Sequence, residues 1–128
     1  MIYLDTSVAL AQVLGEDRRP PVWLWDRPLL SSRLLEYEMW TRIHARGLGE
    51  SHSESVRMLL GRLAFIELSP PVLVRALEPF PGVVRTLDAL HLASIEFLRA
   101  RQRDVELASY DDRLVAAARR LGIAIVDF

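Results

Sequence analysis

The chain begins with Met1-Ile2-Tyr3-Leu4-Asp5, an apolar run that ends in a carboxylate. A short apolar run of this kind is typical of a buried strand. In an open sheet of parallel strands, ligands bind at the carboxyl ends of the strands, and Asp5 would lie there. Two further acids, Glu38 and Asp88, fall inside helical patterns, and Asp111 precedes the final helical pattern. These four acids predict one acidic site assembled from the whole chain.

Strand-like and helix-like apolar patterns alternate from this first strand to the end of the chain. We expect strands over 2–4, 28–32, 65–68, 105–108 and 123–126, and helices over 7–14, 33–46, 50–63, 72–77, 87–101 and 112–121. The stretch 19–25 is ambiguous, because Pro20-Pro21 could open a short helix. Ser31 or Ser32 is expected to cap the helix over 33–46, and Thr86 the helix over 87–101. This alternation predicts a three-layer α/β/α sandwich around a mostly parallel sheet.

Length and composition fit one compact domain over residues 1–128. The 128 residues are 51% hydrophobic and 26% charged, which is enough apolar material for a substantial core. No apolar run approaches the roughly 20 residues that span a bilayer. The N-terminus also lacks the basic start and cleavage region of a signal peptide. A cytoplasmic location is therefore expected.

The side-chain inventory excludes several chemistries. The chain has no cysteine, so disulfides, thiolate zinc sites and cysteine nucleophiles are impossible, and any metal must be held by oxygen or imidazole. All 16 basic residues are arginine, so reactions that need a lysine amine are excluded as well. The net charge of −1 gives no overall attraction to nucleic acid, although a local basic rim remains compatible with it.

Each of the four acids also has a purely structural interpretation. Asp5 and Asp111 precede helices and could act as N-caps. Glu38 could be a solvated surface residue, and Asp88 could complement the dipole of its helix with His91 as a hydrogen-bonding neighbour. Taken together, several carboxylates at close range would repel one another unless a cation neutralises them. Mg²⁺ or Mn²⁺, which prefers oxygen ligands, would suit such a site.

The sequence around these acids resembles PIN-domain ribonucleases, especially the VapC toxins of bacterial toxin–antitoxin pairs. The stretch 3–10 (YLDTSVAL) is similar to the family's opening strand and first acid. The stretch 31–39 (SSRLLEYEM) resembles its second acidic helix, and 87–94 (LDALHLAS) is very similar to its third and most specific signature. The stretch 109–114 (SYDDRL) resembles the closing motif. The likeness extends over nearly the whole chain.

The resemblance implies a catalytic and metal-binding set made of Asp5, Glu38, Asp88 and Asp111. Its second motif offers both Glu36 and Glu38, and placing the acid directly before the apolar Met39 favours Glu38. Its fourth motif offers both Asp111 and Asp112.

The turn after the first acid contains two hydroxyl residues, Thr6 and Ser7. The resemblance implies that one of them could supply a hydroxyl group to the site. A purely structural cap is the alternative role for these side chains.

The activity that the resemblance implies is Mg²⁺- or Mn²⁺-dependent cleavage of RNA. A metal-activated water would attack the phosphodiester in line and leave a 5′-phosphate and a 3′-hydroxyl. Preference for RNA must then come from shape and contacts. Candidate contact residues, or simply solvated arginines, are Arg42, Arg46, Arg85 and Arg113.

The resemblance also implies two kinds of protein partner. One is a cognate VapB-like antitoxin, whose C-terminal segment would lie across the helices near the acids, and the other is a second copy of the chain. A concentration of large side chains could belong to the core or, in part, face a partner: Trp23, Trp25, Tyr37, Met39 and Trp40.

Other magnesium-dependent α/β proteins fit the sequence less well. Phosphoacceptor receiver domains and haloacid-dehalogenase-type phosphatases also place an aspartate after a strand, but both normally use a lysine. The second aspartate of the phosphatase motif would fall at Ser7. No glycine-rich phosphate-binding loop is present either. The remaining rival is a catalytically silent PIN-like module that binds RNA or a protein.

Overall fold

The computed structural model describes all residues from Met1 to Phe128. Its strands are β1 (Ile2–Leu4), β2 (Leu29–Ser32), β3 (Ala64–Ile66), β4 (Glu106–Ala108) and β5 (Ala124–Ile125). Its helices are α1 (Thr6–Leu14), α2 (Arg33–Ala45), α3 (Gly49–Leu60), α4 (Pro70–Leu77), α5 (Thr86–Arg99) and α6 (Asp112–Arg120), with one short 3₁₀ helix, η1 (Val22–Asp26). Every strand and helix expected from the sequence forms, with ends that differ by a few residues.

Two local details differ from the sequence expectations or resolve them. The ambiguous stretch 19–25 forms most of η1, which begins directly after Pro21 and extends to Asp26. Thr86 is not the cap of α5 but its first helical residue, and the N-cap position belongs to Arg85. No side chain caps the start of α5, which leaves the Arg85 side chain free for other contacts.

All five strands form one parallel sheet in the order β3-β2-β1-β4-β5. The chain therefore adds β2 and β3 on one side of β1. It then crosses to the other side of β1, where β4 and β5 lie. Ligand sites of open α/β sheets lie at such a reversal, beyond the carboxyl ends of the strands. Asp5 directly follows β1 there, and its backbone N–H donates to the carbonyl of Ala108 at the end of β4, at 3.0 Å.

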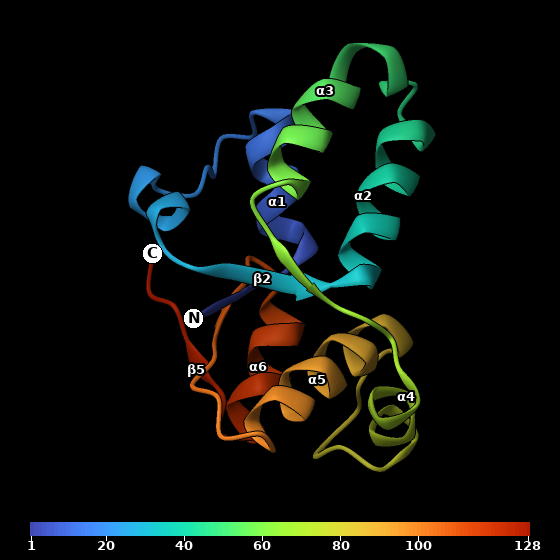
Figure 1. Ribbon diagram of the computed structural model, residues 1–128, viewed down its shortest axis with the longest axis vertical. Coiled ribbons are helices and arrows are strands. Elements are labelled where there is room, and N and C mark those ends of the chain that lie inside the picture. Colours follow the sequence, from blue (N-terminus) through green and yellow to red (C-terminus); the bar gives the residue numbers. More distant parts are fainter.

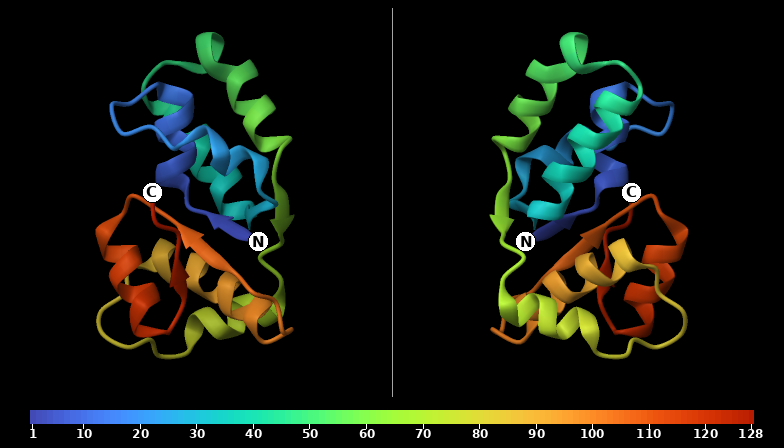
Figure 2. Two further views of the ribbon diagram at one scale, coloured as in Figure 1. Left: turned by 90° about the vertical axis from the view of Figure 1, so that its left-hand side faces the viewer. Right: turned by 90° about the vertical axis from the view of Figure 1, so that its right-hand side faces the viewer.

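The helices cover both faces of the sheet. Helices α1, α2 and α3 lie on one face, and α4, α5 and α6 lie on the other (Figure 1). The side views show the same two layers with the sheet between them (Figure 2). The predicted three-layer α/β/α sandwich is confirmed.

Strand β1 joins the two halves of the hydrophobic core, because side chains alternate between the faces of a strand. Ile2 and Leu4 pack into the cluster beneath α1, α2 and α3. Tyr3 packs into the cluster formed with α5 and α6. All three side chains are fully buried. The strand that carries Asp5 is thus held from both sides, which fixes the acid at its end.

Two of the helices that flank the acidic edge, α1 and α2, begin with side-chain caps that lie beside it. The carboxylate of Asp5 accepts a hydrogen bond from the N–H of Ser7 at the start of α1, and the Ser32 hydroxyl accepts one from Leu34 at the start of α2. Helix α1 ends at Gly15, whose φ of 64° places it in the left-handed region that glycine adopts without a steric penalty.

The large side chains of the first third of the chain divide between core and surface. Met39 is buried, and Trp25 and Trp40 are partly buried against the same cluster. Trp23 and Tyr37 are exposed at 43% and 66%. None of the helices combines the length and the apolar character needed to cross a membrane.

Candidate functional site

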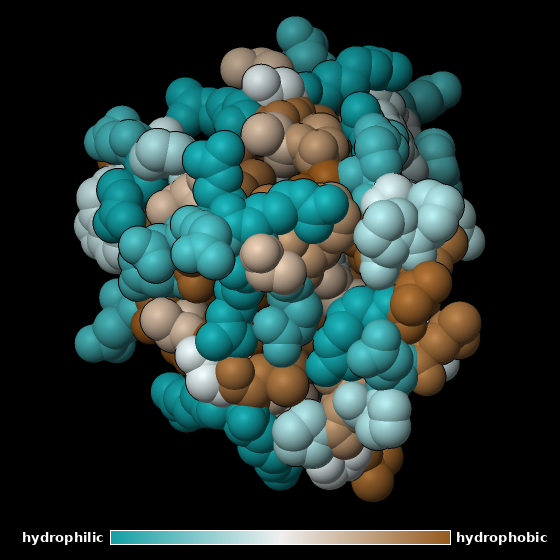
Figure 3. All heavy atoms as spheres, turned by 60° about the horizontal axis from the view of Figure 1, so that its bottom comes forward, coloured by the Kyte–Doolittle hydropathy of each residue, from teal (hydrophilic) through white to brown (hydrophobic).

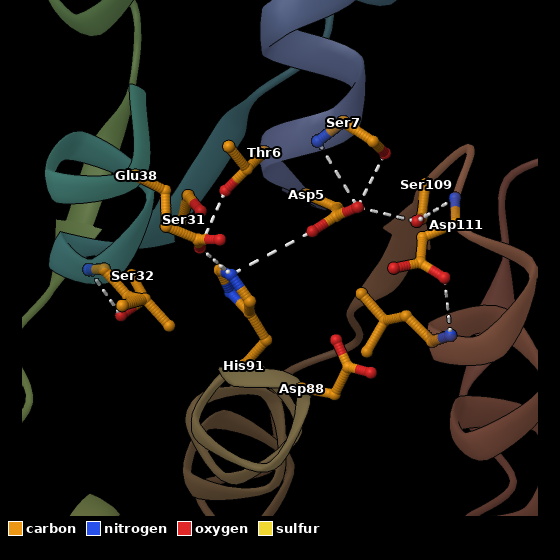
Figure 4. Close-up of polar contacts among 12 residues, drawn as sticks. Asp5, Thr6, Ser7, Ser31, Ser32, Glu38, Asp88, His91, Ser109 and Asp111 are labelled. Atoms are coloured by element: carbon orange, nitrogen blue, oxygen red, sulfur yellow. Dashed lines mark hydrogen bonds and ion pairs between the residues drawn. The ribbon is translucent and has the colours of Figure 1, made fainter. Parts of the chain in front are cut away.

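The four acids predicted from the sequence lie around one space at the carboxyl edge of the sheet. Asp5 comes from the end of β1, Glu38 from α2, Asp88 from the first turn of α5, and Asp111 from the turn before α6. Their carboxylate groups point toward this common space from different sides (Figure 4). The fold therefore brings together four residues that are widely separated in the sequence.

Asp5 uses its two carboxylate oxygens differently. Oδ2 accepts hydrogen bonds from the Ser7 hydroxyl at 2.6 Å and the Ser109 hydroxyl at 2.8 Å, and from the Ser7 N–H at 3.4 Å. Oδ1 has only a distant neighbour, His91 Nε2, at 3.9 Å. Asp5 thus caps α1 with one oxygen and presents the other to the site, so its structural and functional interpretations are compatible.

Glu38 is held by a chain of buried polar contacts. Its Oε1 accepts hydrogen bonds from Thr6 Oγ1 at 2.9 Å and from His91 Nε2 at 2.7 Å. Because a carboxylate can only accept, Nε2 carries the proton, and a neutral imidazole then accepts at Nδ1. The Tyr3 hydroxyl, 2.7 Å from Nδ1, is the donor. Burial raises the pKa of the Tyr3 phenol, which keeps that donor protonated.

The other two acids share one arginine. Arg85 Nε lies 3.2 Å from Asp88 Oδ2, and Arg85 Nη2 lies 3.1 Å from Asp111 Oδ2. Asp111 uses its second oxygen as the N-cap of α6, where Oδ1 accepts from the N–H groups of Arg113 at 3.0 Å and Leu114 at 3.3 Å. Asp111 therefore divides its oxygens between a cap and the site, as Asp5 does.

Asp88 is the acid whose ionisation the site opposes. Burial raises the pKa of its carboxyl, and the negative charges of Asp111 and Asp5 act in the same direction. The nearby Arg85 guanidinium partly counteracts this rise. These surroundings disfavour the charged form of Asp88, and a cation beside it would favour that form.

The structure separates the alternative acids of the second and fourth motifs. Glu38, not Glu36, reaches the common space, because Glu36 lies on the outer side of α2 in an exposed ion pair with Arg33 at 3.4 Å. Asp112 is exposed as the first residue of α6, whereas the side chain of Asp111 contacts Arg85.

Several supporting residues were not recognised from the sequence as parts of the site. Tyr3 was expected only as a strand residue, and Ser109 had no predicted role, yet both hydrogen-bond within the site. His91 was identified only as a possible neighbour of Asp88. His91 lies three residues after Asp88, which places both on the same face of α5, but its hydrogen bonds are with Glu38 and Tyr3.

The four candidate RNA-contacting arginines differ in position. Arg85 is the only one of the four whose guanidinium pairs with the acids. Arg42, Arg46 and Arg113 are exposed and form no ion pair with them.

The donor set fits a hard divalent cation, because four carboxylates surround one space and such a cation takes oxygen ligands. The only cationic side chain that contacts the acids without being a histidine is Arg85, which bridges Asp88 and Asp111. No group of three acid or histidine side chains is yet close enough to hold a metal ion. Side-chain movements would be needed to close the carboxylates around one. A surface hollow of about 490 Å³ lies elsewhere, between α1, η1 and α3.

With this geometry, the comparisons with known proteins are informative. The family model described as PIN domain matches residues 2–120. The chain belongs to the PIN-domain family. This PIN-domain protein is 32% identical to ribonuclease VapC46 of Mycobacterium tuberculosis, over 98% of its own length and 95% of the relative. It is 33% identical to ribonuclease VapC35 of the same species, over 98% of its own length and 96% of that relative. The expected resemblance to VapC proteins is confirmed.

Solved structures have the same fold as this PIN domain. A chain of VapBC2 from Rickettsia felis, in a crystal structure with a DNA fragment from the promoter, matches with a TM-score of 0.74 and 15% identity over 98% of both chains. A chain of a toxin–antitoxin complex from Klebsiella pneumoniae matches with a TM-score of 0.70 and 17% identity, over 99% of this chain and 97% of that one. At these identities the likeness supports the fold alone.

Proposed function

We propose that this PIN-domain protein is a metal-dependent endoribonuclease and the toxin of a toxin–antitoxin pair. The observation that carries the proposal is the convergence of Asp5, Glu38, Asp88 and Asp111 at the carboxyl edge of the sheet. It is supported by relatives named ribonucleases that match 98% of the chain. The alternative of a silent binding module would not require four acids around one space.

In this proposal the four acids would hold Mg²⁺ or Mn²⁺, Asp5 and Glu38 through the oxygen that their structural contacts leave available, and Asp88 and Asp111 through oxygens that Arg85 contacts. When bound, the cation would supply an activated water and neutralise charge on the scissile phosphate. The hydrogen bonds to Glu38 all fall on Oε1, and the short ones to Asp5 all fall on Oδ2. His91, Thr6, Ser7 and Ser109 therefore hold these two carboxylates in fixed orientations with one oxygen directed to the site.

The proposed reaction is hydrolysis of an RNA phosphodiester that leaves a 5′-phosphate and a 3′-hydroxyl. Purified protein, free of any antitoxin, should cleave structured RNA with Mg²⁺ or Mn²⁺, and EDTA should stop the reaction. Asp5→Asn and Asp88→Asn should also stop it, because each removes a charged oxygen donor. Fragments that persist in both variants would come from a contaminant. Metal binding without cleavage of several RNAs would instead favour the silent module.

The proposed protein partner is a VapB-like antitoxin. Relatives named VapC support this partner class, and the two solved structures with the same fold come from complexes of this kind. Expression of the chain alone should arrest bacterial growth, and co-expression of the antitoxin should restore it. Normal growth with abundant folded protein would contradict the toxin assignment. An RNA substrate and such a partner also imply that the protein acts in the cytoplasm.

The proposed homodimer would use the apolar face of α4 and the segment before α5. Exposed apolar side chains gather here: Leu73, Val74, Leu77, Val83 and Leu87, with exposed fractions from 42% to 96%. Figure 3 shows apolar side chains at the edge of the molecule on the side where α4 lies. Contiguous apolar surface of this kind marks interaction sites more often than isolated residues do. Val83 and Leu87 also lie two residues on either side of Arg85 in the sequence.

A further inference from the structure

Arg85 bridges two of the four acids. One guanidinium contacts Asp88 Oδ2 through Nε at 3.2 Å and Asp111 Oδ2 through Nη2 at 3.1 Å. The two acids belong to different elements, the first turn of α5 and the turn before α6. A planar guanidinium with donors along its edges suits such a double contact, which a single ammonium group would not reproduce.

Arg85 is also the only cationic side chain that pairs with Asp88 or Asp111. Asp5 and Glu38 are satisfied by hydroxyl, imidazole and backbone donors. The other arginine ion pairs lie away from the four acids: Arg27 with Glu106, Arg33 with Glu36 and Glu67, and Arg99 with Glu96. Without Arg85, the carboxylates of Asp88 and Asp111 would face each other with no compensating positive charge.

We propose that Arg85 is an internal counter-cation, which a divalent metal ion must displace from Asp88 and Asp111 in order to bind. This inference rests on the proposed metal-dependent function. The two carboxylate oxygens that Arg85 occupies, one on each aspartate, face the space in which the metal would be held. A guanidinium and a divalent cation repel each other at contact distance, so both cannot occupy the same pair of oxygens.

The position of Arg85 allows it to leave. Its side chain is 53% exposed, whereas the side chain of Asp88 is only 13% exposed. Arg85 can therefore rotate into solvent without opening the core, while the acids stay in place. Displacement breaks two partly exposed ion pairs, and such pairs are individually weak. The arginine thus lowers the affinity for metal without blocking the site, and it keeps the acids from repelling each other while no metal is bound.

The test is the binding of Mn²⁺ alone, measured by the loss of the electron paramagnetic resonance signal of the free ion. We expect Arg85→Gln to bind Mn²⁺ about tenfold more tightly than the wild type, because displacement is no longer required. The matched control is Arg113→Gln, which removes the same charge two residues from Asp111 but breaks no ion pair. It should change the Mn²⁺ affinity by less than about threefold. Arg85→Lys, which retains the charge but cannot reproduce the double contact, should bind Mn²⁺ with an affinity between those of the wild type and Arg85→Gln.

The outcomes separate this inference from the proposed function. Unchanged or weaker Mn²⁺ binding by Arg85→Gln, with normal binding by the wild type, would overturn the counter-cation role and leave the metal site intact. An equal gain in Arg113→Gln would also overturn it, because general electrostatics would then suffice. Absence of Mn²⁺ binding in every form would contradict the metal site itself, and with it the inference. Circular dichroism spectra would establish that each variant is folded.

Discussion

At the scale of single residues, the buried contact between Tyr3 and His91 couples the core to the site. The Tyr3 hydroxyl is 2.7 Å from His91 Nδ1, and His91 in turn donates to Glu38. Tyr3→Phe removes only the hydroxyl and leaves a buried imidazole nitrogen without a partner, so we expect a loss of about 1–3 kcal/mol in the free energy of unfolding. Urea unfolding measures this loss of free energy. Tyr37→Phe, at an exposed position, is the control and should change stability by less than about 0.5 kcal/mol. Equal stability of the two variants would contradict the contact.

Asp88 gives a prediction about pH. Its pKa is raised in the folded protein, so the native state takes up a proton at a higher pH than the unfolded chain does. Between the ordinary carboxyl pKa and this raised value, stability therefore increases as the pH falls, and ionisation of Asp88 costs stability at neutral pH. Asp88→Asn lacks this cost. Its stability relative to the wild type should rise as the pH is raised from acid to neutral in metal-free buffer. Urea unfolding at several pH values would show this, and a constant or falling difference would contradict it.

At the scale of elements, Asp111 is predicted to have separable structural and functional roles. Its Oδ1 caps α6 through Arg113 and Leu114, and its Oδ2 faces the site. Asp111→Ala should lose about 1 kcal/mol of stability, the usual value of an N-cap. Asp111→Asn keeps a capping oxygen and should lose less, although both variants should cleave RNA more slowly. Thermal unfolding and cleavage rates measure the two effects. A cap role is contradicted if Asp111→Ala is as stable as Asp111→Asn.

The elements themselves were predictable from the sequence, because periodic apolar patterns record which faces are buried. The end of β1 placed Asp5 correctly, because residues 2–4 of the apolar run form a buried strand and Asp5 directly follows it. The prediction that Thr86 caps α5 was wrong. Threonine is often found at N-caps, but here Arg85 occupies that position and Thr86 is the first helical residue. The choice of Glu38 over Glu36 agrees with helix geometry, since two residues apart they lie on different faces.

The supporting contacts of the site were not predictable in the same way. Tyr3, Ser109 and Arg85 meet their partners across 88, 104 and 26 sequence positions. No periodicity in the chain encodes such pairs. They depend on how the strands and helices pack, so they became visible only once the sheet order placed β1 beside β4 and α5 beneath the acidic edge.

At the scale of the whole molecule, the apolar face of α4 predicts association between two copies. Leu77 is 87% exposed and Val83 is 96% exposed, which leaves large apolar surface in water unless it is covered. Leu77→Glu should shift a dimer to monomer, because it would bury a charge at the interface. The control is Met58→Glu, at a position 69% exposed on α3, and it should leave the dimer intact. Analytical ultracentrifugation distinguishes the forms, and a wild-type monomer at high concentration would contradict the proposed dimer.

The proposed ribonuclease site also depends on the whole molecule, since the fold brings its four acids together from along the chain. The most direct measurement is the rate of RNA cleavage by Glu38→Gln and Glu36→Gln, two matched substitutions that lie two residues apart on α2. We expect Glu38→Gln to lower the rate at least about a hundredfold, because Glu38 faces the site, and Glu36→Gln to stay within about threefold of the wild type. Equal rates for the two variants, or a larger loss in Glu36→Gln, would contradict the assignment of the site.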